Sequence, residues 1–563
     1  MKTLLGALVE TLIKYIRIAT LQNNRTYMKL ALIIGVIVLI TSLSIPHITV
    51  AQRPKTWTVD DDHPADFSKI QDAIDMASIG DTILVGPGTY SPSTTGEVFP
   101  IRLKSGISLI SKHGAAKTIL TAENTGRVIQ CEDVDNTTSI IGFTIKGGVT
   151  FSVYWPDNAG AGIYLDKSSP TIINNIITEN RAHYWGGGIY VNQCSPLIAG
   201  NIITDNYAIF GKGAGINCYA TDTLPIIRDN VITDNHAKVS GGGISCVSNP
   251  SILNNLIMNN SPDGIRAAAG TAEIRNNIIA SNLVNGIIVS GRPIILNNII
   301  KNNANGIYLD TWVNLVFISG NLIMNNTYYG IAAVSRGCNS NKIIDNTIVA
   351  NGGYGIRIYN ENPDFSGRNN IIYHNNLIDN NPNGYDMLPV YNNWYDPVML
   401  EGNYWSDYDG LDDGSGVGAF GEPRVSGDGI GDTDTPHLGL DWYPFLTMNG
   451  WKIPATIDIK PSTINIRSKQ KWAKCYIELP ENYNVSEIDI NSVRLNFAIA
   501  AELSPSEIGD YDNDGKPDLM LSFSMEDVKN TFDAGEQVTI VVMGEIDAEN
   551  QFWGSDVIKV LNN

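Results

Sequence analysis

The chain has 563 residues, with 38 Lys or Arg and 58 Asp or Glu, so its formal net charge is −20. Only 17% of the residues are charged and 43% are hydrophobic, which is enough apolar material for a large core and excludes a long disordered chain. The acidic balance disfavours nucleic acid as the main partner, because phosphate binding needs clustered Lys and Arg. Six Cys in a chain of this length are too few for a disulfide scaffold.

The first 52 residues have the composition of a targeting segment. No charged residue lies between Leu30 and Gln52, and this mostly apolar run ends near the small-residue sequence Thr49-Val50-Ala51. The pattern predicts a signal peptide for residues 1–52, with an uncleaved membrane anchor as the alternative. Both interpretations predict that residues 53–563 are extracellular or at the cell surface, and that the N-terminal segment contacts the membrane at least during export.

Residues 55–90 predict a cap before the first full repeat. Trp57-Thr58-Val59 has the composition of a strand, and Asp66 is placed to cap a helix that runs to about Ser78. Apolar residues at spacings of three and four predict that this helix covers the open end of the following core. The predicted apolar face consists of Phe67, Ile70, Ile74 and Ala77.

A short unit repeats through the middle of the chain. Runs of Ile, Val and Leu lie between pairs of residues that contain Asn, as in 174–180 (NNIITEN) and 297–303 (NNIIKNN). A Gly-Ile pair followed by a variable residue alternates with these runs, at spacings of 20 to 28 residues. Short β-branched runs bounded by turn residues predict strands, and a repeated unit of this length predicts a solenoid. Residues 53–450 are therefore predicted to form an all-β parallel β-helix, with coils about 4.8 Å apart.

Asparagine fits such a fold in two ways. It tolerates the left-handed backbone conformation that tight turns require. Its side-chain amides can also hydrogen-bond from coil to coil when they stack. We therefore expect the repeated Asn residues to lie in columns.

In the last part of the chain, residues 451–563, the repeat ends and apolar residues recur with a period of two. Alternating apolar and polar residues, as in Thr456-Ile457-Asp458-Ile459 and Val538-Thr539-Ile540-Val541, predict six or seven short strands separated by turns. About 110 residues with this pattern favour a small Ig-like β-sandwich.

Three sequence strings resemble a known superfamily. The segment from Trp57 to Tyr90 resembles the opening of pectate-lyase-like right-handed parallel β-helix proteins. The strings 402–408 (GNYWSDY), 427–433 (GDGIGDT) and 441–444 (DWYP) resemble the last coil of NosD-type proteins. The Asn and Gly-Ile repeats resemble those of carbohydrate-binding and sugar-hydrolase proteins of the same superfamily. The resemblance implies a right-handed winding and leaves the chemistry open, because one fold supports many functions.

The copper role of NosD-type proteins is not expected here. Copper needs clustered His, Met or Cys, and the 7 His are scattered along the chain. The sequence also lacks the Gly-His-Gly string of polygalacturonases and the Gln-Asp-Thr string of pectin methylesterases.

Acidic and basic residues gather on one flank of the predicted coils between about residues 150 and 240. The repeat puts Glu179, Asp205 and Asp234 at equivalent positions of consecutive coils, where neighbours would lie about 5 Å apart. The resemblance to lyases of the superfamily implies stacked acids that hold calcium beside a basic residue. The catalytic candidates are Glu179, Asp205, Asp234, Lys212 and Lys238.

Aromatic residues share this flank and suit a sugar ring, which has an apolar face and hydroxyl groups. A turn face with solvated side chains is the alternative, because Asp before Asn is common in turns. The candidates for glycan binding are Tyr154, Trp155, Tyr184, Trp185, Tyr207 and Phe210.

Two acid-rich loops predict calcium binding. Residues 510–518 (DYDNDGKPD) match the first part of an EF-hand loop, although Leu521 stands where that loop has Glu. Residues 407–434 are rich in Asp and Gly and give a second, weaker calcium prediction, with a capping loop without an ion as the alternative. The predicted metal-binding residues of the first loop are Asp510, Asp512, Asp514, Lys516 and Asp518.

Two cysteines occupy equivalent repeat positions. Cys218 and Cys246 each follow a repeat glycine by three residues, so their Cα atoms would lie about 5 Å apart on adjacent coils. A disulfide and a pair of buried free thiols are both compatible with this placement.

The sequence therefore predicts an exported cell-surface or secreted β-helix protein that binds a polysaccharide or surface glycan. A polysaccharide-cleaving enzyme, either a calcium-assisted lyase or a glycoside hydrolase, is the first alternative. A structural surface spacer is the second.

Overall fold

The computed structural model describes residues 53–562, except for residues 269, 312, 335, 360, 361, 363, 365, 366, 433, 434, 498, 533, 548 and 549. The predicted signal peptide or anchor, residues 1–52, lies outside the described residues. No helix in the described part of the chain is long and apolar enough to span a membrane.

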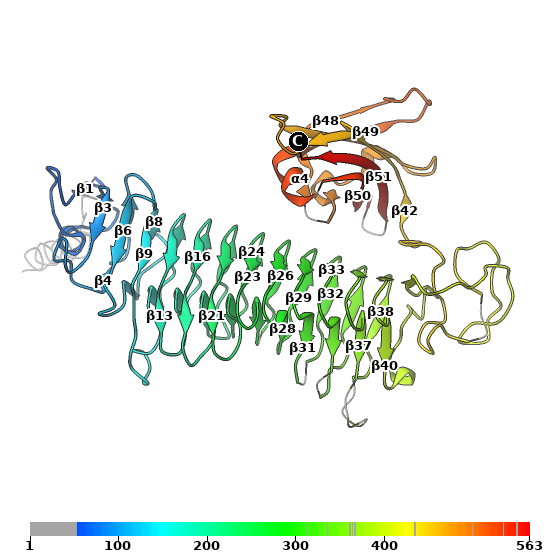
Figure 1. The fold of residues 1–563 in the computed structure, drawn as a ribbon, viewed down its shortest axis with the longest axis horizontal. Helices are drawn as coiled ribbons and strands as arrows, with labels where there is room; N and C mark the ends of the chain where they lie inside the picture. The colour runs from blue at the N-terminus through cyan, green and yellow to red at the C-terminus, as the bar shows by residue number, and fades with distance from the viewer. Residues whose placement is uncertain are drawn as a thin grey trace, which may run out of the picture. The chain divides into compact units, whose positions relative to one another are not determined.

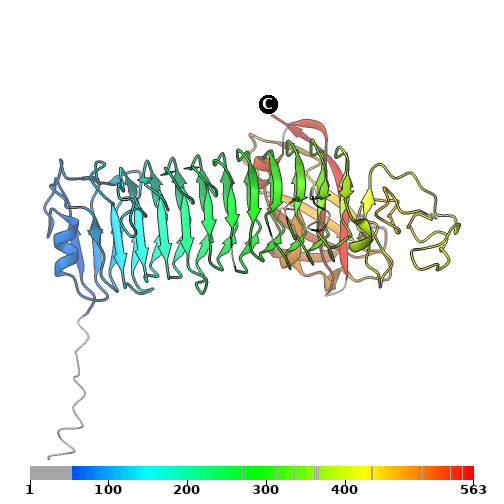
Figure 2. The ribbon, with the colours of Figure 1, turned by 90° about the horizontal axis from the view of Figure 1, so that it is seen from below.

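The middle of the chain winds into a parallel β-helix (Figures 1 and 2). One coil contains β10 (Ile163–Asp166), β11 (Thr171–Ile173) and β12 (Ile176–Thr178), and each of these strands belongs to a different sheet. The next coil repeats this order with β14 (Ile189–Asn192), β15 (Leu197–Ala199) and β16 (Ile202–Thr204). Each strand pairs in parallel with its counterpart, so that Ile163 faces Ile189 and Ile177 faces Ile203. The predicted solenoid is confirmed.

The described residues form two long sheets of 13 strands and one of 12 strands. The 12-stranded sheet positions the candidate site, and we call it the groove sheet. Its strands in order are β4 (Ile101–Arg102), β7 (Ile129–Glu132), β10, β14, β18 (Ile216–Tyr219), β22 (Ile244–Cys246), β25 (Ile265–Ala267), β28 (Asn285–Val289), β31 (Asn305–Leu309), β34 (Tyr329–Ala333), β37 (Ile356–Ile358) and β40 (Gly384–Asp386).

One 13-stranded sheet begins with β1 (Thr56–Val59) and β2 (Thr82–Val85) and ends with β38 (Ile371–Tyr373). The other begins with β3 (Gly88–Tyr90) and ends with β39 (Asn376–Ile378) and β41 (Tyr404–Trp405). A short three-stranded sheet lies beside them, formed by β13 (Arg181–Ala182), β17 (Tyr207–Ala208) and β21 (His236–Ala237).

Columns of isoleucine fill the interior of the solenoid. Because successive coils are in register, Ile172, Ile198, Ile227 and Ile252 lie one above another, and all four are fully buried. Burying a side chain of this size contributes roughly 1.5–3 kcal/mol each, so the columns are the main source of stability.

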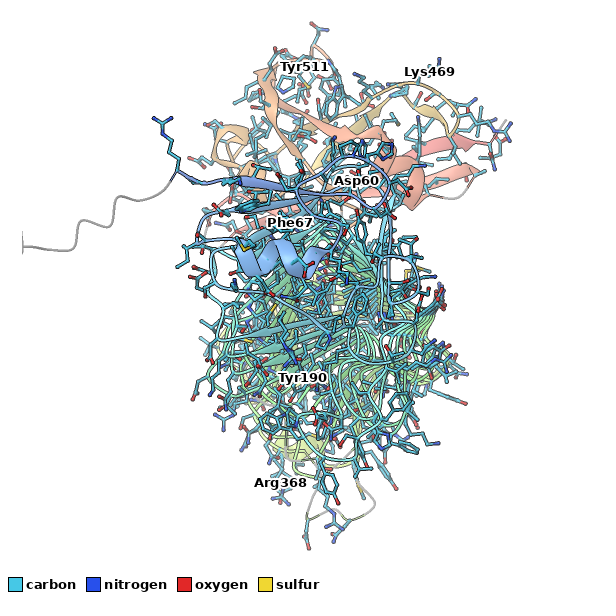
Figure 3. All side chains as sticks on the ribbon, turned by 90° about the vertical axis from the view of Figure 1, so that its left-hand side faces the viewer. Asp60, Phe67, Tyr190, Arg368, Lys469 and Tyr511 are labelled. Atoms are coloured by element: carbon cyan, nitrogen blue, oxygen red, sulfur yellow. The ribbon has the colours of Figure 1, made fainter. Side chains whose placement is uncertain are left out.

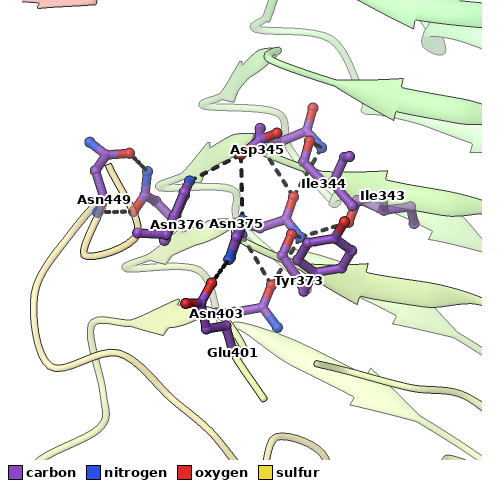
Figure 4. A network of polar contacts seen from close by, with 12 residues as sticks. Ile343, Ile344, Asp345, Tyr373, Asn375, Asn376, Glu401, Asn403 and Asn449 are labelled. Atoms are coloured by element: carbon purple, nitrogen blue, oxygen red, sulfur yellow. Dashed lines mark hydrogen bonds and ion pairs between the residues drawn. The ribbon is translucent and has the colours of Figure 1, made fainter. Parts of the chain in front are cut away.

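Asparagine amides form two long ladders along the described coils, and a shorter one joins Asn341, Asn370 and Asn392. In each Asn pair, the first residue takes the left-handed conformation, as Asn174 does with φ 56°. The second residue is buried and bonds to the next coil: the side-chain nitrogen of Asn175 donates to Asn201 Oδ1 at 3.1 Å. Figure 4 shows the end of this ladder, where Asn375 donates to Asn403 Oδ1 at 2.9 Å. The expected stacking of Asn residues is confirmed.

Helix α3 (Ile70–Met76) lies at the N-terminal end of the solenoid, where it contacts β1, β2 and β4. Figure 3 faces this end and shows α3 near Phe67. The prediction that Asp66 caps the helix is wrong, because the Asp66 carboxylate accepts instead from the backbone nitrogen and hydroxyl of Thr58. The helix starts at Ile70, where the Glu97 carboxylate accepts from the backbone nitrogens of Ile70 and Gln71 at 2.8 and 3.1 Å.

The C-terminal module contains two sheets around its own apolar core. The described six-stranded sheet includes β42 and β44 parallel to β51, pairings that a fully antiparallel Ig-like sandwich would lack. Its strands are β42 (Ile453–Pro454), β44 (Thr463–Asn465), β46 (Arg494–Leu495), β47 (Ile499–Ala500), β50 (Gly535–Glu545) and β51 (Gln551–Leu561). The four-stranded sheet contains β43 (Thr456–Lys460), β45 (Trp472–Glu478), β48 (Glu502–Gly509) and β49 (Asp518–Ser524), and the helix α4 (Met525–Thr531) follows it.

Candidate functional site

A groove of about 540 Å³ lies over the strands β14 to β25 of the groove sheet. Its floor comes from the outward-facing residues of successive strands, which the register places side by side: Tyr190, Asn217, Ser245 and Arg266. Trp185 and Lys212 occupy equivalent positions on adjacent coils and line the groove as well. Trp155, Asn192, Gln193, Tyr219 and Val247 complete the lining.

The groove brings three of the predicted candidates together, namely Trp155, Trp185 and Lys212. The sequence reasoning missed Tyr190, Tyr219 and Arg266. Tyr190 and Arg266 are each the variable residue after a Gly-Ile pair. Because the Ile of each pair points into the core, the next residue must point outward, and this alternation is the signal that could have found them.

Two cations face the groove without a carboxylate in contact. Burial, followed by the positive charge of Arg266, lowers the pKa of Lys212. Burial also lowers the pKa of Arg266, while the more distant Asp310 and Asp263 act in the opposite direction. Among the described residues, neither cation has a carboxylate oxygen within 4.0 Å, so both retain charge that an anionic ligand could neutralise.

Arg127 fixes the loop that carries Trp155. Its Nε donates to the carbonyl of Ala159 at 2.9 Å, and its guanidinium lies 4.3 Å from the ring centre of Tyr164. A second guanidinium nitrogen donates to the carbonyl of Pro156, next to Trp155. Tyr164 stacks in turn on Tyr190 in the floor of the groove, with ring centres 5.7 Å apart. The position of Trp155 therefore depends on a half-buried arginine that is not itself in the groove.

The groove also contains an unused polar atom. Ser245 Oγ is buried and has no hydrogen-bond partner among the described residues. A buried hydroxyl without a partner costs roughly 1–3 kcal/mol. The aromatic rings and the two cations of the groove could contact a ligand that has an apolar ring face and a negative charge.

The other aromatic candidates form a ridge beside the groove, at and next to β13, β17 and β21. The ring centres of Tyr184 and Phe210 are 6.3 Å apart, and His183 lies 4.8 and 4.9 Å from them. Tyr207 stacks on His236 at 5.1 Å. Tyr154 is 77% exposed and Lys238 is exposed, and neither is among the lining residues of the groove.

The three acidic candidates stack at the corner of consecutive coils. The preceding threonines pair in register, and Glu179, Asp205 and Asp234 all have φ near 54°. Their carboxylates have separate local partners: Lys146 lies 3.5 Å from Glu179, and the hydroxyls of Thr204 and Thr233 donate to Asp205 and Asp234. In the part of the chain that the structure describes, these acids belong to no group of three ligand atoms close enough to hold a metal ion, and they do not line the groove.

Carboxylates do converge in the loop before β49. One oxygen each from Asp510, Asp512 and Asp518 lie within 4.8 Å of one another, and Asp512 also groups with Asp514 and Glu478. Burial and the negative charges of neighbouring acids raise the pKa of Asp518. The ammonium group of Lys516 contacts Glu478 and Asp514 at 2.9 and 3.5 Å, so it neutralises the second group more than the first.

The Asp/Gly-rich segment 407–432 uses its carboxylates differently. Asp412 accepts from the backbone nitrogens of Gly427 and Gly429, and Asp428 accepts from that of Ile430. Among its described residues no group of three metal-ligating atoms occurs, and Asp434 lies outside the described residues. The calcium prediction for residues 407–434 stays a prediction.

The paired cysteines are free thiols. Cys218 and Cys246 lie opposite each other on β18 and β22, and both are buried. Contact between the two thiols and burial raise the pKa of Cys218 well above its usual value. Of the two alternatives, the structure has the buried thiol pair.

Comparison with known proteins supports the fold. The family described as "Right handed beta helix region" matches residues 109–271, and the family described as "Periplasmic copper-binding protein (NosD)" matches residues 267–410. No curated protein matches the chain.

Three solved structures illustrate its structural neighbours. An alginate lyase from a Paenibacillus species is 15% identical, with 52% of this chain and 94% of the other covered and a TM-score of 0.34. The A-module of the mannuronan C-5 epimerase AlgE6 from Azotobacter vinelandii is 15% identical, with coverage of 56% and 90% and a TM-score of 0.31. A complex of XylC with xylose is 12% identical, with coverage of 76% and 90% and a TM-score of 0.38. Similarity at this level says nothing about substrate or activity.

The copper chemistry in the name of the matching family does not fit the residues present. Among the described residues, the groups of three or more closely placed His, Cys, Asp or Glu ligands consist only of carboxylates. Copper favours imidazole and sulfur ligands. In the matched segment, His374 bonds to Glu401 at 2.7 Å and stacks on Trp451 instead.

The in-register coils and the two family matches lead to one assignment. The described residues form a parallel β-helix of the kind that the right-handed β-helix family describes, and residues 267–410 are similar to the NosD family.

Proposed function

We propose that the protein binds an acidic polysaccharide in the groove over β14 to β25. The observation that carries this proposal is the pair of cations, Lys212 and Arg266, held together without a contacting carboxylate in a chain of net charge −20. A uronate carboxylate between them would remove their mutual repulsion. Trp185, Trp155 and Tyr219 offer ring faces for the apolar side of the sugars.

Binding measurements with defined polymers test this proposal. Polygalacturonate and alginate serve as acidic probes and dextran as the neutral control, with affinity measured by calorimetry. We expect Arg266→Gln and Trp185→Ala each to weaken binding of the retained acidic polymer at least tenfold. Arg292→Gln removes one exposed positive charge from a loop outside the groove and is the matched control. Equal affinity in Arg266→Gln and Arg292→Gln would overturn the proposal.

Cleavage of the bound polysaccharide is the second candidate function. Lys212 favours it, because a lysine whose pKa is lowered can accept a proton nearer neutral pH. Arg266 would then neutralise the substrate carboxylate while Lys212 removes the proton from the neighbouring carbon C5. The electron pair forms the C4–C5 double bond as the glycosidic C4–O bond breaks, and the leaving oxygen takes a proton from water. Lyase activity would give unsaturated products that absorb in the ultraviolet and would be lost in Lys212→Gln. If the polymer is bound and no new chain ends form, the cleavage proposal fails and the binding proposal stands.

We further propose that the protein works outside the cytoplasm. The support is the predicted signal or anchor in residues 1–52 together with the word "periplasmic" in the description of the matching NosD family. Localisation of a C-terminally tagged chain, with and without residues 1–52, tests this.

We also propose calcium binding in the loop 510–518. Hard carboxylate oxygens suit calcium, and those of Asp510, Asp512 and Asp518 already lie within reach of one ion. Removal of calcium should destabilise the C-terminal module.

A further inference from the structure

A second group of aromatic and cationic residues lies on the same sheet, four strands beyond the floor of the groove. Arg357 on β37 is surrounded by tyrosines, with its guanidinium 4.6, 4.9 and 5.5 Å from the ring centres of Tyr359, Tyr354 and Tyr329. Tyr385 packs on Tyr354 and Tyr359, with ring centres 5.6 and 6.2 Å apart. We call these five residues the tyrosine–arginine cluster.

Arg357 has unused capacity to bind an anion. One terminal nitrogen donates to the Tyr329 hydroxyl at 2.7 Å, but the buried Nε has no partner among the described residues. Within the described residues no carboxylate forms an ion pair with Arg357. A half-buried guanidinium of this kind presents a fork of donors that fits a carboxylate or sulfate.

The register connects this cluster to the groove. Arg266 pairs with Ile288, Ile288 with Tyr308, Tyr308 with Ala332, and Ala332 with Arg357. Since the two arginines are four strand spacings apart in one outward-facing column, they lie about 19 Å apart along the solenoid axis. Both arginines are therefore placed on one straight line that follows the direction in which the coils stack.

We propose that the tyrosine–arginine cluster is a second binding site for the acidic polysaccharide, and that one chain runs along the groove sheet from Arg266 to Arg357. This inference rests on the proposed function of the groove. Arg357 binds a carboxylate or sulfate of the sugar chain, and the partly exposed rings of Tyr354 and Tyr385 contact sugar faces. Two linked sites give long chains an affinity that short ones cannot reach, because the second contact is intramolecular.

Calorimetry with uronate oligomers of two lengths tests the proposal on the full chain. Tetramers and dodecamers prepared from polygalacturonate and from alginate are titrated into the wild type, Arg266→Gln and Arg357→Gln. We expect two tetramers per wild-type chain and one tetramer per chain of each variant. We expect one dodecamer per wild-type chain, bound at least tenfold more tightly than a tetramer, and loss of this length advantage in both variants.

Arg368→Gln is the matched control, because Arg368 also stacks on a tyrosine, Tyr391 at 4.2 Å, but lies outside this column. If Arg357→Gln keeps two tetramers and the length advantage while Arg266→Gln loses one tetramer, the second site is overturned and the groove stands. If Arg266→Gln alone has no effect, the proposed groove fails and the cluster is the site. Thermal unfolding of each variant shows whether a smaller number of bound tetramers results from unfolding of the chain.

Discussion

Asn403 donates two hydrogen bonds to one buried carboxylate oxygen of Asp441, from its backbone nitrogen at 2.7 Å and from its side-chain nitrogen at 3.2 Å. Asp441 therefore takes the place that the next asparagine would occupy in the ladder, and it also accepts from the indole nitrogen of Trp405 at 2.8 Å. The ladder thus ends on a carboxyl oxygen, which accepts from both nitrogens of Asn403.

Asp441 should make stability depend on pH. Burial raises its pKa to about 6, compared with 3.8 for the free side chain. The folded state thus holds the proton more tightly, so this stabilisation is complete below pH 3.8 and is lost as the pH rises through about 6. The loss for this group is at most about 3 kcal/mol.

Urea unfolding at pH 5 and pH 7.5 measures this effect. We expect Asp441→Asn to be less stable than the wild type at pH 5, because the new amide group faces a backbone donor, and to lose less stability between the two pH values. Asp413→Asn changes an exposed carboxylate of the same segment and serves as the control. The assignment is wrong if the wild type and Asp441→Asn share the same pH dependence.

The other asparagine ladder, which runs through Asn303, should contribute strongly to stability. Asn303 is buried, donates to Asn326 Oδ1 at 3.1 Å and accepts from the side chain of Asn282 at 3.0 Å. Asn303→Ala leaves these groups unpaired and should lower the free energy of unfolding by about 2–4 kcal/mol.

The neighbouring residue gives a matched control for this substitution. Asn302 is exposed and has φ 56°, which glycine tolerates without strain. Asn302→Gly should therefore change the urea midpoint much less than Asn303→Ala. Similar losses in the two variants would mean that the turn, and not the amide ladder, carries the energy.

Arg127 should affect polysaccharide binding without touching the ligand. Arg127→Met removes the bonds that hold Ala159 and Pro156, so Trp155 loses its fixed position, and we expect affinity for the retained polymer to fall about tenfold. Arg102→Met removes a positive charge from an exposed position on the same sheet and leaves the loop intact. An unchanged affinity in Arg127→Met would show that Trp155 is not a binding residue.

Calcium should stabilise the C-terminal module. Asp512 belongs to both carboxylate groups, so Asp512→Asn should remove most of the increase in melting temperature that calcium produces over a chelator. At 100 times the dissociation constant, the ion would add about 2.7 kcal/mol to the wild type. Glu536→Gln, which breaks an exposed pair with Lys559 in the same module, is the control. A melting temperature that does not respond to the chelator contradicts the site.

The solenoid could be predicted from the sequence because the sequence patterns that specify it are local. The Asn pairs, the Gly-Ile pairs and the β-branched runs each describe one turn or strand, and repetition then fixes the stacking. The cap of α3 could not be predicted in this way, since its partner Glu97 is 27 residues from Ile70 in sequence. Asp66, which is adjacent to the helix, looked like the better cap.

The groove was only partly predictable for a related reason. The side chains of Trp155, Trp185 and Lys212 could be assigned to one flank from their place in the repeat. Whether a given residue points into a groove or along a ridge depends on the turn geometry of its own coil. Tyr184 and Trp185 are adjacent in sequence, yet only Trp185 lines the groove.

The regular winding has a consequence for how such a surface can change. Arg266 and Arg357 occupy the same position in different coils, so duplication or deletion of a repeat would alter their separation by one whole strand spacing, about 4.8 Å, and by no intermediate amount. The distance between equivalent residues on different coils is therefore always a whole multiple of the strand spacing. A repeating polymer can contact two such residues in the same way only if its own repeat matches one of these multiples.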